Sequence, residues 1–215
     1  MKRWKNKPLI TYGLLIINAI VFVVWLYLKF RLQHQDGFNS EQSGVIAGVL
    51  LGAESPFLVL QLHEYWRIFT AMFVHFGIMH ILCNSVFLYA IGQVTETVLG
   101  HVRYLILYLG SGIIGNIIPM IFYQDQAAVA GASGALFGLL GMWTVMWLMY
   151  RHHPNTLIDD YGKEMFTLAV ANIVLNLFMS GVSILGHIGG FIGGMIVGFI
   201  MLRWFKPLFI KKMNL

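Results

Sequence analysis

The stretch Ala127–Tyr150, AAVAGASGALFGLLGMWTVMWLMY, contains no Asp, Glu, Lys or Arg. A helix needs about 20 apolar residues to cross the hydrocarbon core of a membrane, so this stretch has spanning length. Backbone amides cannot stay unpaired in lipid, which makes a helix the expected structure. The stretch also holds Ser133, a hydroxyl set between Gly131 and Gly134. Glycines around a polar residue in an apolar run indicate a close approach of the backbone.

Five other runs share this length and lack of charge, and they are Leu9–Leu28, Gly77–Val94, Tyr104–Tyr123, Met165–Leu185 and Gly186–Leu202. The chain is 58% hydrophobic and 11% charged, with a mean hydropathy of +0.74. Soluble domains carry about 25% charged residues. We therefore expect an all-α membrane protein, a bundle of six transmembrane helices that forms one domain over residues 1–215. The first run is too long for a signal-peptide core and should remain a helix.

Basic residues around the runs predict the orientation of the bundle. With six spans, eleven Lys and Arg residues fall on the side of both termini, and only Lys29, Arg31 and Arg67 fall on the other. The positive-inside rule then places both termini in the cytosol. The net charge of +5 reports this topology and contact with anionic lipid rather than nucleic-acid binding. The expected location is a bacterial cell membrane, with an organelle as the alternative.

One long connection, Lys29–Phe76, links the first two predicted helices on the outer side. It contains the apolar stretches Val45–Leu51 and Pro56–Leu62, which are too short to span the membrane. A connection of this length is usually functional or disordered, and this one is too hydrophobic for disorder. We expect it to lie partly in the membrane interface.

Polar side chains inside a predicted span are costly and normally face the interior of the bundle. His80 and Asn84 are four residues apart, so they lie on one face of the same helix, and His75 comes just before it. They could serve a reaction, or they could only hydrogen-bond neighbouring helices. A metal site needs three or more ligands, and no nearby carboxylate or second close histidine supplies them, so no metal is expected. The one cysteine, Cys83, is interpreted as an apolar packing residue.

His187 begins the last predicted helix within Gly186-His187-Ile188-Gly189-Gly190. On a helical wheel it shares one face with a stripe of small residues, Gly190, Gly194 and Gly198. The 127–150 helix carries a matching face of Gly134, Gly138 and Gly141. If the two faces meet, Ser133 and His187 approach each other near the outer surface, and Phe137 packs against the imidazole. The alternatives are a serine that only allows tight helix packing and a histidine bonded to a carbonyl at a helix end.

A nucleophilic serine needs a base to take its proton. No Asp or Glu lies within any of the runs, so the predicted unit is a Ser133–His187 dyad rather than a triad. An oxyanion also needs preorganised donors. His80, Asn84 and the backbone N–H of Ser133 could supply them.

The chain resembles the rhomboid intramembrane serine proteases from the outer connection to the last helix. The resemblance is carried by an ordered set of motifs: Trp66-Arg67, His75-x4-His80-x3-Asn84, Glu96 with Gly100, Gly131-x-Ser133-Gly134 and His187-x2-Gly190-x3-Gly194. It implies that Ser133 is the nucleophile, that His187 is the general base, and that His80 and Asn84 help to form the oxyanion hole. Trp66 and Arg67 look like the residues that shape the membrane-embedded loop of the family. Phe137 stands where the family often has a tyrosine stacked on the base.

The resemblance further implies cleavage of single-span membrane protein substrates in or near their transmembrane segments, without a cofactor or metal. The rival class is a transporter or a non-catalytic protein that binds membrane helices, since Asn18, Asn116, Asn172 and Asn176 add polar groups to the interior. A transporter would predict internal repeats or paired broken helices, and the sequence contains neither.

Overall fold

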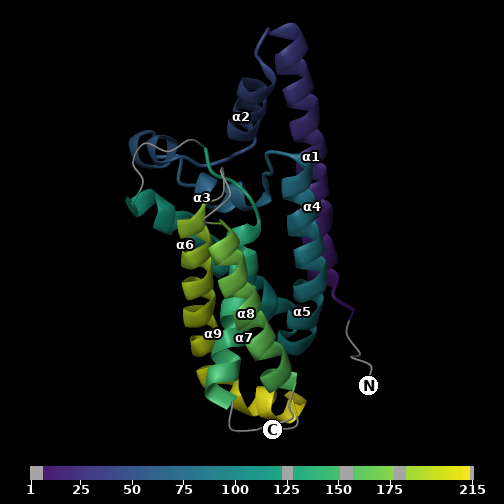
Figure 1. Cartoon of the computed structure of the whole chain (residues 1–215), viewed down its shortest axis with the longest axis vertical. Helices are drawn as coiled ribbons and strands as arrows, with labels where there is room; N and C mark the ends of the chain where they lie inside the picture. Colours follow the sequence, from purple (N-terminus) through teal and green to yellow (C-terminus); the bar gives the residue numbers. More distant parts are fainter. Residues whose placement is uncertain (1–6, 123–127, 151–156, 177–182, 214–215) are drawn as a thin grey trace.

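The computed structural model describes residues 7–122, 128–150, 157–176 and 183–213, and within these ranges the chain is helical without a β-strand. The long helices are α1 (Leu9–Gln35), α6 (His101–Phe122), α7 (Ser133–Tyr150), α8 (Leu157–Asn176) and α9 (Ile184–Met213). The shorter elements are α2 (Ser40–Leu50), η1 (Phe57–Gln61), α3 (Arg67–Thr70), η2 (Ala71–Phe73), α4 (Ile78–Phe87), η3 (Leu88–Gly92) and α5 (Gln93–Leu99). Figure 1 shows α4 and α5 stacked end to end beside α1.

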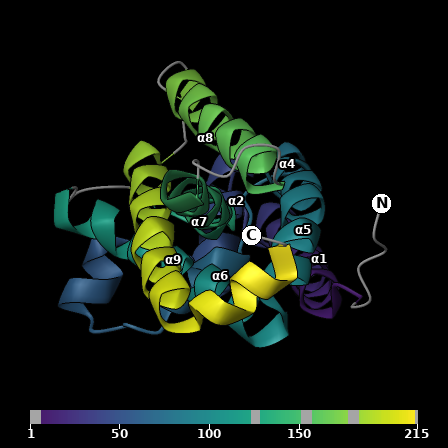
Figure 2. The same cartoon turned by 90° about the horizontal axis from the view of Figure 1, so that it is seen from below.

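Helix α7 forms the centre of the bundle. Every residue from Gly134 to Met146 is buried. Seen from below, the helix is surrounded by α4, α6, α8 and α9 (Figure 2). A helix that is apolar on all sides belongs in the middle of a bundle. The uncharged run quoted first in the sequence is therefore the core around which the other helices pack.

Five helices are long and apolar enough to cross a membrane: α1, the continuous α4–η3–α5 rod over residues 78–99, α6, α7 and α9 over residues 184–204. Their lipid-facing residues include large exposed apolar side chains such as Ile16, Val23, Val86 and Ile196. The expectation of an all-helical membrane bundle is confirmed, and the count of six spans stays a prediction. The predicted span that is missing from these five is Met165–Leu185, the fifth uncharged run in chain order.

The helix that contains the start of this run begins before the predicted first residue, Met165. Helix α8 begins at Leu157, so it includes Asp159, Asp160, Lys163 and Glu164 in its first turns. Charged side chains do not stop a helix when they reach water or headgroups, which is why the uncharged run underestimated its length. Residues 177–182 of this run lie outside the described residues, so its crossing of the membrane remains a prediction.

Other predicted boundaries also differ from the structure. Helix α7 begins at Ser133 rather than at residue 127, because residues 128–132 are held in a non-helical conformation. Helix α1 continues past Lys29 as far as Gln35, and a break comes only with Gly37 at φ +73°. Helix α9 continues beyond residue 202 to Met213. In the last two cases basic residues lie inside a helix whose hydrophobic part ends earlier.

The α1–α4 connection, residues 36–77, is folded against the helices. The indole N–H of Trp25 on α1 donates to the carbonyl of Gly44 on α2 at 2.9 Å. Trp25 also packs in a small apolar cluster with Phe22, Ala47 and Ile81. Several large apolar side chains of the connection stay exposed, namely Phe57, Leu60, Leu62, Tyr65, Trp66 and Phe69. Such a surface suits the membrane interface, which the sequence predicted for this segment.

Glu96, which forms a sequence motif with Gly100, lies at the end of the bundle opposite to the α1–α4 connection. Its carboxylate accepts hydrogen bonds from the backbone N–H groups of Ile10 and Thr11, at 2.9 and 2.8 Å, and from the Thr11 hydroxyl at 2.7 Å. These are unsatisfied first-turn donors of α1, where a carboxylate is favoured. Gly100, at φ +82°, ends α5 directly after this contact. The motif therefore joins α1 to α5, far from Ser133.

Candidate active site

Ser133 is the first residue of α7, and the turn before it depends on Gly131. Gly131 has φ +130°, in the region that favours glycine, and its N–H donates to the carbonyl of Ala71 at 2.9 Å. A Cβ at this position would lie 2.6 Å from Nε2 of His80 and 3.5 Å from Nδ2 of Asn84. The missing side chain thus allows the turn that leads to Ser133 to lie directly against two polar side chains of α4.

His187 lies in the first turn of α9, which Ser183 caps. The Gly186 N–H donates to the Ser183 hydroxyl at 3.2 Å, and the His187 N–H donates to the Ser183 carbonyl at 3.1 Å. The imidazole is buried and stacks on Phe137, with ring centroids 4.3 Å apart and planes 12° from parallel. Since Phe137 is one turn after Ser133, this contact brings His187 to the Ser133 end of α7.

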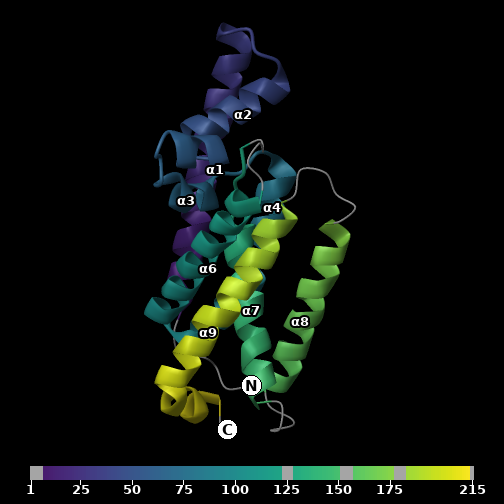
Figure 3. The ribbon, with the colours of Figure 1, turned by 90° about the vertical axis from the view of Figure 1, so that its left-hand side faces the viewer.

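Glycine contacts between α6, α7 and α9 fix that arrangement. A Cβ on Gly190 would lie 2.0 Å from the carbonyl oxygen of Gly134, and one on Gly194 would lie 1.9 Å from that of Gly138. The two glycine faces expected from the sequence therefore meet, backbone against backbone. Figure 3 shows α9 running obliquely across α7 and α6. The sequence reasoning missed Gly115 of α6, where a Cβ would lie 3.2 Å from Cα of Gly134.

Asn84 and His80 are on one face of α4, as their spacing predicted. Asn84 is buried, and its Nδ2 has no hydrogen-bond partner among the described residues. An unpaired buried N–H group is costly, so it is a candidate donor for a ligand oxygen. Because Nδ2 faces Gly131, that oxygen would lie beside the turn that carries Ser133.

His75 lies behind His80. The two rings make an edge-to-face contact with centroids 5.0 Å apart. Burial lowers the pKa of the His75 imidazole to about 3, with a smaller contribution from His80, so the ring is neutral near pH 7. Nδ1 lies 3.2 Å from the Phe73 carbonyl, and a neutral ring must carry its proton on Nδ1 to donate there. Among the described residues, no group of three or more His, Cys, Asp or Glu side chains could hold a metal.

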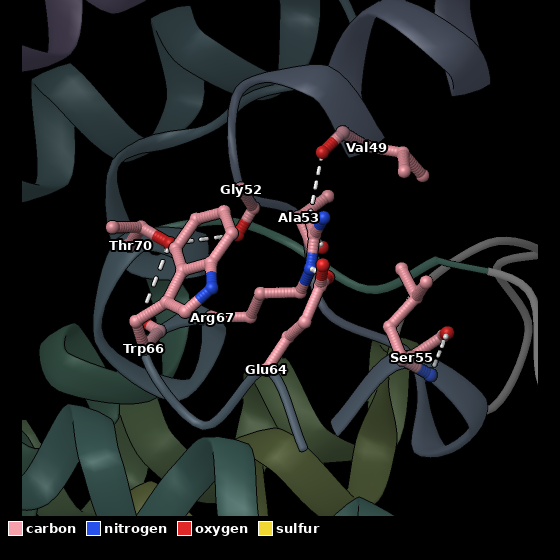
Figure 4. Close-up of polar contacts among 9 residues, drawn as sticks. Val49, Gly52, Ala53, Ser55, Glu64, Trp66, Arg67 and Thr70 are labelled. Carbon is pink, nitrogen blue, oxygen red and sulfur yellow. Dashed lines mark hydrogen bonds and ion pairs between the residues drawn. The ribbon is translucent and has the colours of Figure 1, made fainter. Parts of the chain in front are cut away.

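Trp66 and Arg67 hold the α1–α4 connection together, as Figure 4 shows. The Arg67 guanidinium donates to the carbonyls of Val49 at 2.6 Å and Ala53 at 2.9 Å. It is also paired with Glu64 and lies 4.4 Å from the centroid of the Trp66 ring. All of these contacts lie within the α1–α4 connection.

A second anchor ties the connection to the bundle. The Asn116 side chain on α6 donates to the Ile68 carbonyl of α3 at 2.8 Å. Nothing in the sequence pattern indicated this pair, because the residues are 48 positions apart. The Ser183 cap could have been found, since serine before an apolar helix is a common N-cap; the sequence reasoning instead assigned it to the preceding helix.

Residues 62–204 match the Rhomboid domain. The chain is 29% identical to the "Putative rhomboid protease YdcA" of Bacillus subtilis (strain 168) over 91% of this chain and 89% of that protein. It is 31% identical to the "Rhomboid protease GluP" of the same organism over 88% of this chain, but only 34% of GluP. It is also 37% identical to "RHOMBOID-like protein 2" of Arabidopsis thaliana over 67% of this chain and 44% of that protein.

The domain match covers more than half of the chain, and these relatives agree with it. The chain therefore belongs to the rhomboid family, a family of multi-pass intramembrane serine proteases. The resemblance seen in the sequence motifs is confirmed at this level.

Proposed function

We propose that this protein is an intramembrane serine endopeptidase that cuts single-span membrane proteins in or near their transmembrane segments, with a Ser133–His187 dyad. The observation that carries the proposal is the convergence at the start of α7. The Gly131 turn lies against His80 and Asn84, while Phe137, one turn further along α7, stacks on His187. Two helices from distant parts of the chain, α4 and α9, thus carry the side chains that we assign as oxyanion donors and as the base.

In the proposed reaction the Ser133 hydroxyl attacks a substrate carbonyl carbon, and His187 takes the hydroxyl proton. The oxyanion accepts hydrogen bonds from Asn84, His80 and the backbone N–H of Ser133. When the peptide C–N bond breaks, His187 returns its proton to the leaving amine. Water then attacks the acyl-enzyme, with His187 again as the base, and releases the new carboxyl end and free Ser133.

Asn84 gives this scheme specific support. Its buried Nδ2 has no partner among the described residues, and a Cβ on Gly131, in the turn before Ser133, would lie 3.5 Å from it. A developing negative charge on an oxygen is stabilised by donors already in place. Neither a metal nor a cofactor is part of the proposed reaction.

The alternative hypothesis of a transporter was based on asparagine side chains that add polar groups to the interior of the bundle. Asn116 donates to the Ile68 carbonyl, and Asn172 donates to the Leu168 carbonyl of its own helix at 2.9 Å. These two side chains therefore support the fold rather than a solute path. Asn18 is also buried, on α1.

The proposed location is a bacterial cell membrane, with both termini cytosolic and the Ser133 end facing outward. The eleven-to-three distribution of Lys and Arg supports this orientation. The functional test is cleavage of single-span proteins by the purified protein in liposomes, beside Ser133→Ala. Cleavage by wild type and none by the variant is the expected result, whereas equal cleavage would point to a contaminating protease or another nucleophile.

A further inference from the structure

Glu54 is an acid that the proposed reaction does not use. It lies in the α1–α4 connection between α2 and η1 and is only 1% exposed. Neither carboxyl oxygen has a hydrogen-bond partner among the described residues. A buried carboxyl group without donors is far cheaper in its neutral form than as an anion. The buried position of the Glu54 side chain is therefore stable only while its carboxyl group is protonated.

The backbone of Glu54, by contrast, is fully paired with the segment that leads to Ser133. Its N–H donates to the Val129 carbonyl at 3.0 Å, and its carbonyl accepts from the Val129 N–H at 2.7 Å. This antiparallel bridge is the one β-type pairing in the described part of the chain. Two residues further on, the Gly131 N–H donates to the Ala71 carbonyl. Three backbone hydrogen bonds from the connection therefore hold residues 129–131.

The segment 129–131 sets the position of Ser133. A Cβ built on Gly131 would lie 2.6 Å from Nε2 of His80 and 3.5 Å from Nδ2 of Asn84, so the turn lies close to both side chains and a shift of Val129 would move it away from them. Misplacement of a catalytic group by about 1 Å is enough to slow a reaction by about 10²-fold. The bridge at Glu54 thus acts on the site without any contact with a substrate.

We propose that Glu54 is a positioning residue whose buried, uncharged side chain keeps the connection seated on segment 129–131, and whose ionisation releases that segment. This inference rests on the assignment of Ser133 as the nucleophile. Arg67 donates to the Ala53 carbonyl next to Glu54 and is paired with Glu64 (Figure 4), and neither ion pair found among the described residues, Arg67–Glu64 and His101–Glu96, involves Glu54.

The sign of the pH effect follows from burial. Burial raises the pKa of the Glu54 carboxyl from 4.5 to about 9. In the released segment Glu54 meets water and has its ordinary pKa, so between these two values only the released form is ionised. The released form therefore gains population as pH rises from about 4.5 to about 9, by up to about tenfold per pH unit. Above that range both forms are ionised and the effect levels off.

The test compares amide hydrogen exchange of a peptide covering residues 128–135 in wild type and Glu54→Gln, between pH 6 and pH 9. Comparison at each pH cancels the intrinsic pH dependence of exchange. The ratio of wild-type to variant exchange rates should rise with pH. Glu54→Leu, a second uncharged side chain, should behave like Glu54→Gln. As the matched control, Glu41→Gln removes an exposed acid of α2 and should keep the wild-type dependence.

Cleavage gives the second readout, since the ratio of kcat for Glu54→Gln to kcat for wild type should also rise with pH. An exchange ratio that is the same at every pH overturns the release of the segment. A pH-dependent exchange ratio with parallel kcat profiles overturns the positioning role. The exchange measurement needs no activity and can be repeated in Ser133→Ala, so failure of the proposed dyad would be seen separately.

Discussion

At the residue scale, the site is defined by what Gly131 lacks. A methyl group there would lie 2.6 Å from Nε2 of His80, at a φ of +130° that other residues rarely adopt. Such backbone strain costs roughly 1–3 kcal/mol. Gly131→Ala should therefore lower kcat strongly, by displacing either the turn or His80. The matched control is Gly13→Ala on α1, where a Cβ meets nothing within 4 Å; equal rates for the two variants would contradict this account.

Asn84 gives a second prediction at this scale, because its Nδ2 is buried and unpaired among the described residues. Removing one oxyanion donor typically lowers the rate by about 10²–10³. Asn84→Ala should show this loss in kcat, with little change in KM, in steady-state assays with a membrane-bound substrate. Asn172→Ala, which removes a bond within α8, should stay near wild type. A raised KM with unchanged kcat would make Asn84 part of a binding groove instead.

At the element scale, the contact between α7 and α9 has no room for side chains. A methyl group on Gly190 or Gly194 would strike a backbone carbonyl of α7, which cannot rotate away as a side chain can. Gly190→Ala and Gly194→Ala should therefore force the helices apart and cost about 1–3 kcal/mol or more. The measurement is the thermal unfolding midpoint in detergent. Gly110→Ala, where the new Cβ has an ordinary 3.6 Å contact with Val197, should remain stable; an equal drop in all three would refute the close contact.

The elements also show what the sequence could predict. The glycine spacing on two uncharged runs correctly paired α7 with α9, and the spacing of His80 and Asn84 placed both on one face. Helix ends were predicted less well. Charged residues continue α8 and α1 beyond their apolar runs, and the start of α7 depends on bonds to Glu54 and Ala71. Local hydrophobicity contains no information about partners that are far away in the chain, so these ends needed the structure.

At the scale of the whole molecule, the two ends of the bundle should face opposite sides of a membrane. The connection lies at the Ser133 end, since Ala71 bonds to Gly131, while Glu96 binds the start of α1 at the other end. In a Cys83→Ala background, a cysteine at Glu41 should react with an impermeant maleimide in intact cells. A cysteine at Lys7 should react only after the membrane is opened. The reverse pattern would invert the protein and its proposed substrate orientation.

The central claim is that Ser133 and His187 act as one catalytic unit, and cleavage kinetics in liposomes test it most directly. Cleavage rates are measured with one single-span substrate for four proteins: wild type, Ser133→Ala, His187→Ala and the double variant. Their thermal unfolding midpoints are compared first, to show that all four are equally well folded. Each single change should reduce cleavage to background, and the double variant should be no worse, because residues that act as a unit are not additive. Robust cleavage by Ser133→Ala, or losses that multiply in the double variant, would contradict the dyad.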